Sequence, residues 1–296
     1  MESEITAARI ANAILQDEEF EGQYVLVEGV KDLRLYRKFI REELRMKPTF
    51  GKYKLRQVYE ILESRQFYKV FGIRDADFLR IPNNPKFDHA YMDSIFVTDS
   101  HDSEVMMIDS KALMDFLIVV SDFDKVKKFE NKLGKSVRVL LYELGYNIGC
   151  LKLANKRKSL GLVFKPEKVG GNAIKYKKFI CDKSFTFLGN ESLVVAAIDY
   201  SRNRKTELAS KAVILHELEA VLAEKHDTLE IVNGHDLAEI LYLIVTKGLG
   251  SNSSLLNGAD SVENSLIMSY DITQFTKTKL YGMIDGHQKR KGLNII

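Results

Sequence analysis

The sequence predicts an α/β fold, in which a parallel sheet flanked by helices is followed by a mostly helical C-terminal region. Short apolar runs at residues 24–27 and 68–73 each end at acidic residues, which is typical of buried strands that deliver side chains to one edge of a sheet. Segments with helical periodicity separate these runs, and this alternation favours a parallel sheet with covering helices.

The first apolar run is YVLV, and Glu28 and Gly29 follow it directly. An amphipathic segment at 33–44 then predicts a helix. Glu28 is therefore expected at the carboxyl end of a strand, the edge of an α/β sheet where ligands bind. Taken alone, Glu28 fits a solvated turn residue better than a functional one.

The second apolar run leads to Asp75 and Asp77. In an extended segment, residues two apart point to the same side. If the two strands lie side by side, three carboxylates converge, and they repel one another unless a cation is present. Hard divalent cations such as Mg²⁺ prefer carboxylate oxygen. The alternative is that the two aspartates only cap a turn.

A third short strand is predicted at 94–97, followed by acidic residues at the start of a helix. Glu104 is the candidate for a second metal position. His101 either shuttles a proton or hydrogen-bonds the neighbouring loop. Capping of the helix is expected from one of three residues: Asp99, Asp102 or Ser103.

Glu28-Gly29 at a strand end, with Asp75-x-Asp77 closing a strand about one βα unit later, resembles the TOPRIM nucleotidyl-transfer and nuclease domain over about residues 20–120. Residues 96–104 (FVTDSHDSE) resemble the third acidic motif of the DUF4435 family, and residues 233–237 (NGHDL) resemble its later G-H-D-L element. The narrower resemblance is to the TOPRIM effector nucleases of PARIS anti-phage defence systems.

This resemblance implies a metal-dependent endonuclease that uses Mg²⁺ or Mn²⁺. The implied metal ligands are Glu28, Asp75, Asp77 and Glu104, and the implied catalytic residues are the same four together with His101. It also implies an ATPase partner subunit that holds the protein inactive until a phage trigger releases it. The released form, expected as a homodimer, would cleave host tRNA.

Two alternatives remain open at this point. The same acids would serve a DNA nickase resembling the overcoming-lysogenization-defect nucleases. A TOPRIM fold that has lost its chemistry would instead act as a binding subunit. No G-x-S-x-G motif, Cys–His pair or Walker A motif is present, so the sequence offers neither an activated serine or cysteine nucleophile nor ATP hydrolysis by this chain alone.

The composition suits a cytoplasmic globular protein. The 296 residues are 45% apolar and 29% charged, without an apolar run long enough to span a membrane, so no membrane association is expected. The acidic N-terminus argues against a secretory signal. Cys150 and Cys181 are expected as reduced thiols. The net charge is +3, and basic clusters around 152–158, 165–183 and 289–291 are either a phosphate-binding face or scattered surface lysines.

We expect two parts: residues 1–120, an N-terminal helix plus the TOPRIM-like catalytic domain, and residues 121–296, mainly helical with a small irregular or β insert near 148–190. The loop at 79–93 is expected to gate the acidic site.

Three polar positions have two interpretations each. Asp32 either joins the site or stabilises a helix dipole, and Lys52 either meets a phosphate or lies on the surface. His235 and Asp236 either cap a helix or fold back on the acids.

Overall fold

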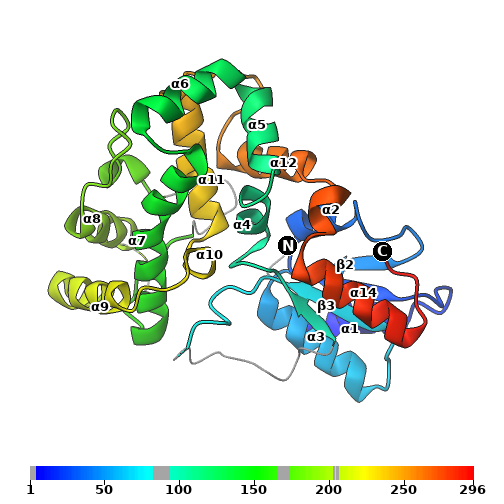
Figure 1. Ribbon diagram of the computed structural model, residues 1–296. Helices are drawn as coiled ribbons and strands as arrows, with labels where there is room; N and C mark the ends of the chain where they lie inside the picture. The colour runs from blue at the N-terminus through cyan, green and yellow to red at the C-terminus, as the bar shows by residue number, and fades with distance from the viewer. Residues whose placement is uncertain (1–4, 83–93, 166–173, 203, 205–206) are drawn as a thin grey trace.

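In the computed structural model, which describes residues 5–82, 94–165, 174–202, 204 and 207–296, a parallel sheet carries helices on both faces (Figure 1). The described strands pair in the order β2-β1-β3-β4, and all three pairings are parallel. This confirms the predicted fold class. The strands are β1 (Tyr24–Val27), β2 (Arg45–Pro48), β3 (Val70–Arg74) and β4 (Ile95–Val97).

The sheet is buried on both faces because the side chains of β1 alternate between two apolar layers. Tyr24 and Leu26 pack into one layer, and Val25 and Val27 pack into the other. Helices α1 (Ala7–Leu15) and α3 (Lys52–Ser64) cover the first layer. Helix α2 (Val30–Tyr36) is the first of the helices that cover the second layer.

The edge strand β2 was not predicted. The expected helix at 33–44 ends early, at Tyr36, and the chain then turns into β2, which pairs with β1 from Tyr24↔Arg45 to Val27↔Pro48. Its sequence, RMKP, has no apolar run and ends in proline, which sheets accept at an edge. Pairing with β1, and not local sequence, makes this segment a strand.

Two helix breaks separate the sheet from the helical region. The apolar stretch 105–120 is divided between two helices, α4 (Ser103–Ile108) and α5 (Ala112–Val120), and the Ser110 hydroxyl accepts the backbone N–H of Ala112 between them. The second break falls at Gly134, which adopts the left-handed conformation between α6 (Phe123–Leu133) and α7 (Val137–Lys158).

The remaining chain is helical, and the predicted insert at 148–190 is smaller than expected because α7 continues to Lys158. Within the described part of that insert, one isolated antiparallel bridge joins Ile180 and Phe187. Residues 166–173 and most of the predicted gate, 83–93, lie outside the described residues. The later elements are the 3₁₀ turn η2 (Tyr176–Lys178), α8 (Asn190–Ser201), α9 (Lys211–Ala223), α10 (Thr228–Ile231), α11 (Gly234–Leu243), the π-helical turn η3 (Ile244–Gly248), α12 (Ala259–Ser269), α13 (Ile272–Phe275) and α14 (Lys279–Lys291).

The C-terminal segment returns to the sheet. Helix α14 lies beside the sheet (Figure 1) and packs against β4. The His287 ring lies against Phe71 and Phe96. The buried Ile295 accepts a hydrogen bond from the backbone N–H of Arg41 at 2.9 Å. The tail therefore docks on the first part of the chain. The division near residue 120 stays a prediction.

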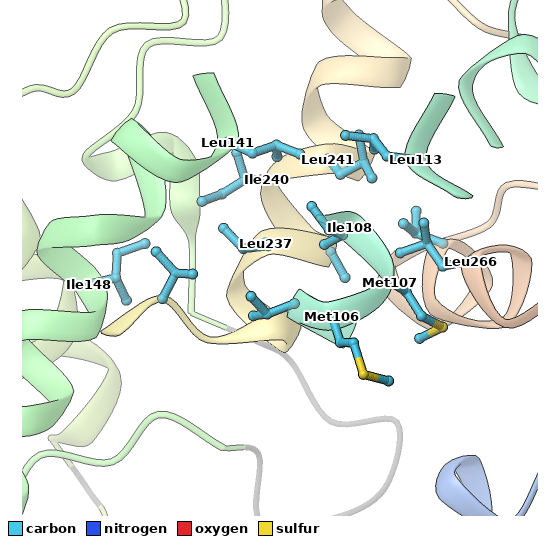
Figure 2. Close-up of a cluster of buried hydrophobic side chains, with 14 of the residues drawn as sticks. Met106, Met107, Ile108, Leu113, Leu141, Ile148, Leu237, Ile240, Leu241 and Leu266 are labelled. Carbon is cyan, nitrogen blue, oxygen red and sulfur yellow. The ribbon is translucent and has the colours of Figure 1, made fainter. Parts of the chain in front are cut away.

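A buried apolar cluster fixes α11 between α4 and α7 (Figure 2). It draws side chains from five helices: Met106, Met107 and Ile108 of α4, Leu113 of α5, Leu141 and Ile148 of α7, Leu237, Ile240 and Leu241 of α11, and Leu266 of α12. The start of α11 consequently lies beside α4, at the sheet edge where the strands end.

No helix in the described ranges combines the length and apolar character that crossing a membrane requires. Cys150 is buried, Cys181 is partly buried, and both are free thiols.

Candidate functional site

The carboxyl ends of the central strands open into a cavity of about 860 Å³. Four residues predicted from the sequence line it together: Glu28, Asp75, Asp77 and Glu104. Two further acids and several cations complete the charged lining: Asp32 and Asp102, and Lys31, Arg34, Lys52, Lys54 and Lys165. The cavity therefore combines an acidic floor with a basic rim, which suits a phosphate-bearing ligand and a divalent cation.

Glu28 connects the end of β1 to the end of β3. Its Oε1 accepts the backbone N–H of Asp75 at 3.1 Å, and the Arg74 guanidinium lies 4.0 Å away. Burial, with help from the Asp77 charge, raises the pKa of Glu28 to about 7, although Arg74 opposes the shift. A carboxyl group with this pKa can accept and release a proton near neutral pH.

Asp75 joins β3 to the start of α4. Its Oδ1 accepts the backbone N–H of Ser103 at 3.0 Å. Burial raises the pKa of Asp75 well above its ordinary value, and the charges of Asp32 and Glu28 add to the effect. A buried carboxyl group among other acids is a costly arrangement without a cation, and a bound divalent ion would relieve it.

Asp77 departs from the geometry expected for an extended D-x-D segment. Strand β3 ends at Arg74, and Asp77 has a left-handed φ of 48°. Its Oδ2 lies 2.5 Å from Nζ of Lys52. Burial is the largest single influence on the pKa of Asp77 and raises it, but Lys52, His101 and Lys156 together lower it by more, so the net shift is downward. Asp77 is thus an anion already paired with a cation.

The capping expected for residues 99–104 is present in two places. Asp102 caps α4 by accepting the backbone N–H of Val105 at 2.9 Å. Asp99 instead accepts the N–H groups of Lys279 and Leu280, at 2.7 and 2.8 Å, and so ties the loop after β4 to the start of α14. The second contact joins residues 180 positions apart and could not be read from the sequence.

His101 is buried beside the cavity wall, at 1% exposure. Its Nδ1 donates to the carbonyl of Glu230 at 3.0 Å, and Nε2 lies 3.2 Å from Nδ2 of Asn233. Burial lowers the pKa of His101 to about 4, so the ring is neutral at physiological pH. Both nitrogens hold neighbouring segments, which supports the loop-bonding interpretation. Its catalytic role stays a prediction.

Asp32 is a site residue that sequence analysis left undecided. Its Oδ2 accepts the backbone N–H of Gly29 at 2.9 Å, so it does act at the helix start. It also lies near Glu104, and the Ser103 hydroxyl donates to the two carboxylates at 3.4 and 3.2 Å. Burial, reinforced by Glu104, raises the pKa of Asp32 to about 7. Its position four residues after Glu28, in the first helical turn, is the sequence signal for this placement.

The segment Asn233-Gly234-His235 folds back on the acids. The Gly234 backbone N–H donates to Oδ2 of Asp102 at 2.7 Å. Asn233 makes no side-chain cap for α11, and its amide oxygen accepts from Nζ of Lys152 at 3.1 Å. His235 bonds through Nδ1 to Oε1 of Glu263, at 2.6 Å. Glu263 gave no sequence signal, because its contact depends on how α12 packs.

The basic clusters serve several roles. Lys165 lines the cavity. Lys152 is 2.6 Å from the buried carboxylate of Asp236, whose other oxygen accepts from Tyr176, so this pair belongs to the interior. Lys289 pairs with Asp285 on α14. These three lysines therefore lie in different surroundings, and a shared phosphate-binding face stays a prediction.

The residues fit a divalent cation, although not as one tight cage. Among the described residues, one group of three candidate ligands has its atoms within 4.8 Å of one another: Glu104, His235 and Glu263. The four predicted ligands, Glu28, Asp75, Asp77 and Glu104, line one cavity, but their carboxylate oxygens are not all this close to one another. Glu28, Asp75, Asp32 and Glu104 are the residues that would hold Mg²⁺ or Mn²⁺ there, because they are largely buried carboxylates.

The comparisons with known proteins do not identify the chain. No protein-family model matches the sequence, and no curated protein matches it significantly. The resemblance to the TOPRIM domain and the DUF4435 family therefore stays a prediction.

Proposed function

We propose that the chain is a metal-dependent nuclease of TOPRIM type and that the acidic cavity is its active site. One observation carries the proposal: the ends of two neighbouring strands and the start of α4 bring Glu28, Asp75 and Glu104 to one cavity with a basic rim. Phosphodiester hydrolysis needs carboxylates for the cation and cations for the phosphate.

Each charged residue of the cavity has a proposed role in phosphodiester cleavage. Glu28, whose pKa is about 7, accepts a proton from the attacking water or hydroxyl group. Asp75 and Glu104 supply carboxylate oxygens, and Lys52 and Lys165 neutralise the phosphates that flank the scissile bond. When bound, Mg²⁺ or Mn²⁺ polarises the scissile phosphate and stabilises the leaving oxygen.

The cellular role that we propose rests on the motif resemblance. The chain would be the toxic effector of a bacterial anti-phage system, held inactive by an ATPase partner and cleaving host tRNA as a dimer once released. The ordering of Glu28, Asp75-x-Asp77 and Glu104 along a parallel sheet supports a TOPRIM nuclease. The substrate, the partner and the dimer are supported by the resemblance alone.

A growth experiment tests the proposal. The wild-type chain, Glu28→Ala, Asp75→Ala and the surface control Asp199→Ala are induced with and without the presumed ATPase partner, and total RNA and DNA are run on gels. We expect toxicity from the wild type and the control, with fragmented tRNA, and none from the two cavity variants. Fragmented DNA in place of tRNA would favour the nickase.

A binding subunit without chemistry is the second candidate. The Lys52–Asp77 pair favours it, because an ammonium group occupies the carboxylate expected to bind metal. This candidate predicts equal behaviour of all four proteins in the growth experiment, under every condition that triggers the system.

A further inference from the structure

A group of metal-ligand side chains lies at the junction of the sheet and the helical region. Glu104 comes from α4, His235 from α11 and Glu263 from α12, and one ligand atom of each lies within 4.8 Å of the others. Glu104 and Glu263 are 6% and 2% exposed, whereas the His235 side chain is 49% exposed. Two buried carboxylates thus face a reachable imidazole.

The approach of α11 to α4 is built into the backbone. A Cβ atom at Gly234 would come within 2.3 Å of Cβ of Glu104 and 2.4 Å of Oδ1 of Asp102, so only glycine allows this contact. The Gly234 N–H donates to the other oxygen of Asp102. These contacts hold His235, the next residue, beside Glu104.

Glu104 is a buried carboxyl group with few hydrogen-bond partners. Its Oε2 accepts a hydrogen bond from Ser103 at 3.2 Å, and its Oε1 has no hydrogen-bond partner within the described residues. After burial, Glu104 is the largest cause of the raised pKa of both Asp32 and Asp102. A buried acid surrounded by acids favours a cation.

We infer that Glu104, His235 and Glu263 bind a divalent transition-metal ion, with Mn²⁺ and Zn²⁺ as the fitting species. Imidazole nitrogen suits Zn²⁺ and the two carboxylates suit Mn²⁺, whereas Mg²⁺ prefers an all-oxygen shell and keeps several waters. Three protein ligands leave coordination positions for water or for a phosphate oxygen. Glu104 and His235 also line the acidic cavity, so the ion lies at its edge and joins the helical region to it.

An ion-pair network is the alternative use of the same residues. Lys31 pairs with Glu263 and, at 2.8 Å, with Asp260, while His235 bonds the second oxygen of Glu263. Asp260 is largely exposed, so Lys31 can keep that partner when an ion takes Glu263. Removing the Lys31 charge distinguishes the two uses. Because an ammonium group repels a metal ion, its removal should strengthen metal binding, whereas its removal from an ion-pair network should destabilise the protein.

Titration with Mn²⁺, followed by electron paramagnetic resonance in excess Mg²⁺, tests the inference on the full chain. We expect one Mn²⁺ site that Mg²⁺ does not displace. His235→Ala and Glu263→Gln should each weaken it by more than about tenfold. His216→Ala, on the exposed face of α9, is the matched control and should leave the Mn²⁺ site unchanged. Unchanged Mn²⁺ binding in His235→Ala overturns the inference.

Lys31→Met supplies a test in the opposite direction. If the group binds a metal ion, removing the ammonium charge should tighten Mn²⁺ binding by about tenfold. In excess Mg²⁺, added Mn²⁺ should raise the melting temperature of wild type and Lys31→Met but not of His235→Ala. The melting temperature could instead fall in His235→Ala, Glu263→Gln and Lys31→Met alike and stay unchanged on addition of Mn²⁺. That result identifies a purely structural ion-pair network and overturns the inference.

The inference rests on the proposed function, because Glu104 belongs both to the acidic cavity and to the group with His235 and Glu263. The experiments below distinguish failure of the inference from failure of the proposed function. Glu28→Gln should abolish cleavage and keep the Mg²⁺-resistant Mn²⁺ site. Mn²⁺ binding that depends on His235, without any cleavage, leaves this inference standing and the nuclease proposal refuted. Cleavage in Mg²⁺ without Mn²⁺ binding that depends on His235 supports the nuclease proposal and refutes this inference.

Discussion

Gly234 and Glu104, 130 positions apart in the sequence, touch so closely that a Cβ on Gly234 would lie 2.3 Å from Cβ of Glu104. Gly234 begins α11, and Glu104 lies in the first turn of α4. The contact places the helical region against the acidic cavity. It explains why a segment late in the chain contributes His235 to a site that otherwise comes from the sheet.

Gly234→Ala should destabilise the protein and disturb the cavity. The methyl group meets the side chains of Glu104 and Asp102, so one helix must shift, at a cost of about 1–3 kcal/mol in the free energy of unfolding. Urea unfolding measures the change. Gly282→Ala on α14 is the control, since a Cβ there meets nothing within 4 Å and should be neutral or stabilising. Equal effects of the two substitutions would contradict the steric explanation.

The metal-free protein should lose stability as the pH rises from about 4 to above 7. The pKa values of Glu28 and Asp32 are raised to about 7 in the folded state, so folding takes up protons between the ordinary carboxyl value and 7. The contribution of these two groups to the free energy of unfolding is fully present below about pH 4 and is lost as the pH rises through 7. Melting temperatures in EDTA across this range measure it.

Two controls accompany the pH series. Glu28→Gln removes one of the titrating groups and should flatten the decline. Excess Mg²⁺ should raise the melting temperature most at the high-pH end, where the carboxylates are ionised and free to bind it. A decline that neither Glu28→Gln nor Mg²⁺ alters would place its cause outside the cavity.

Lys52→Met should weaken nucleic-acid binding and lower its salt dependence. Lys52 lines the cavity beside Asp77, and loss of one phosphate contact there reduces the salt slope by about one. Fluorescence anisotropy at several salt concentrations measures this, with Lys211→Met on α9 as the control. If Lys52 only holds Asp77, the salt slope will match that of wild type.

Leu237→Ala should loosen the attachment of the helical region. Leu237 is fully buried between α11, α4 and α7, and its loss should cost about 2–5 kcal/mol in the free energy of unfolding. Met268→Ala, at a 79% exposed position on α12, should change it by less than about 0.5 kcal/mol. Thermal unfolding of both variants checks the difference, and equal stabilities would exclude Leu237 from the core that Figure 2 shows.

The sheet core and its first acids were predictable because their signals are local. The YVLV run before Glu28 and the apolar run before Asp75 are short strands buried on both faces, so the residue after each lies at the sheet edge. The break at Gly134 also has a local cause, since glycine adopts the left-handed conformation at low cost.

The tertiary structure alone decided the rest. Strand β2 exists because β1 offers it backbone hydrogen bonds, and Asp77 turns away from an extended path to meet Lys52. His235 and Glu263 reach Glu104 only after α11 and α12 have packed on α4. Hydrophobic periodicity determines which face of each element is buried, whereas contacts between charged residues far apart in the chain depend on how those buried faces fit together.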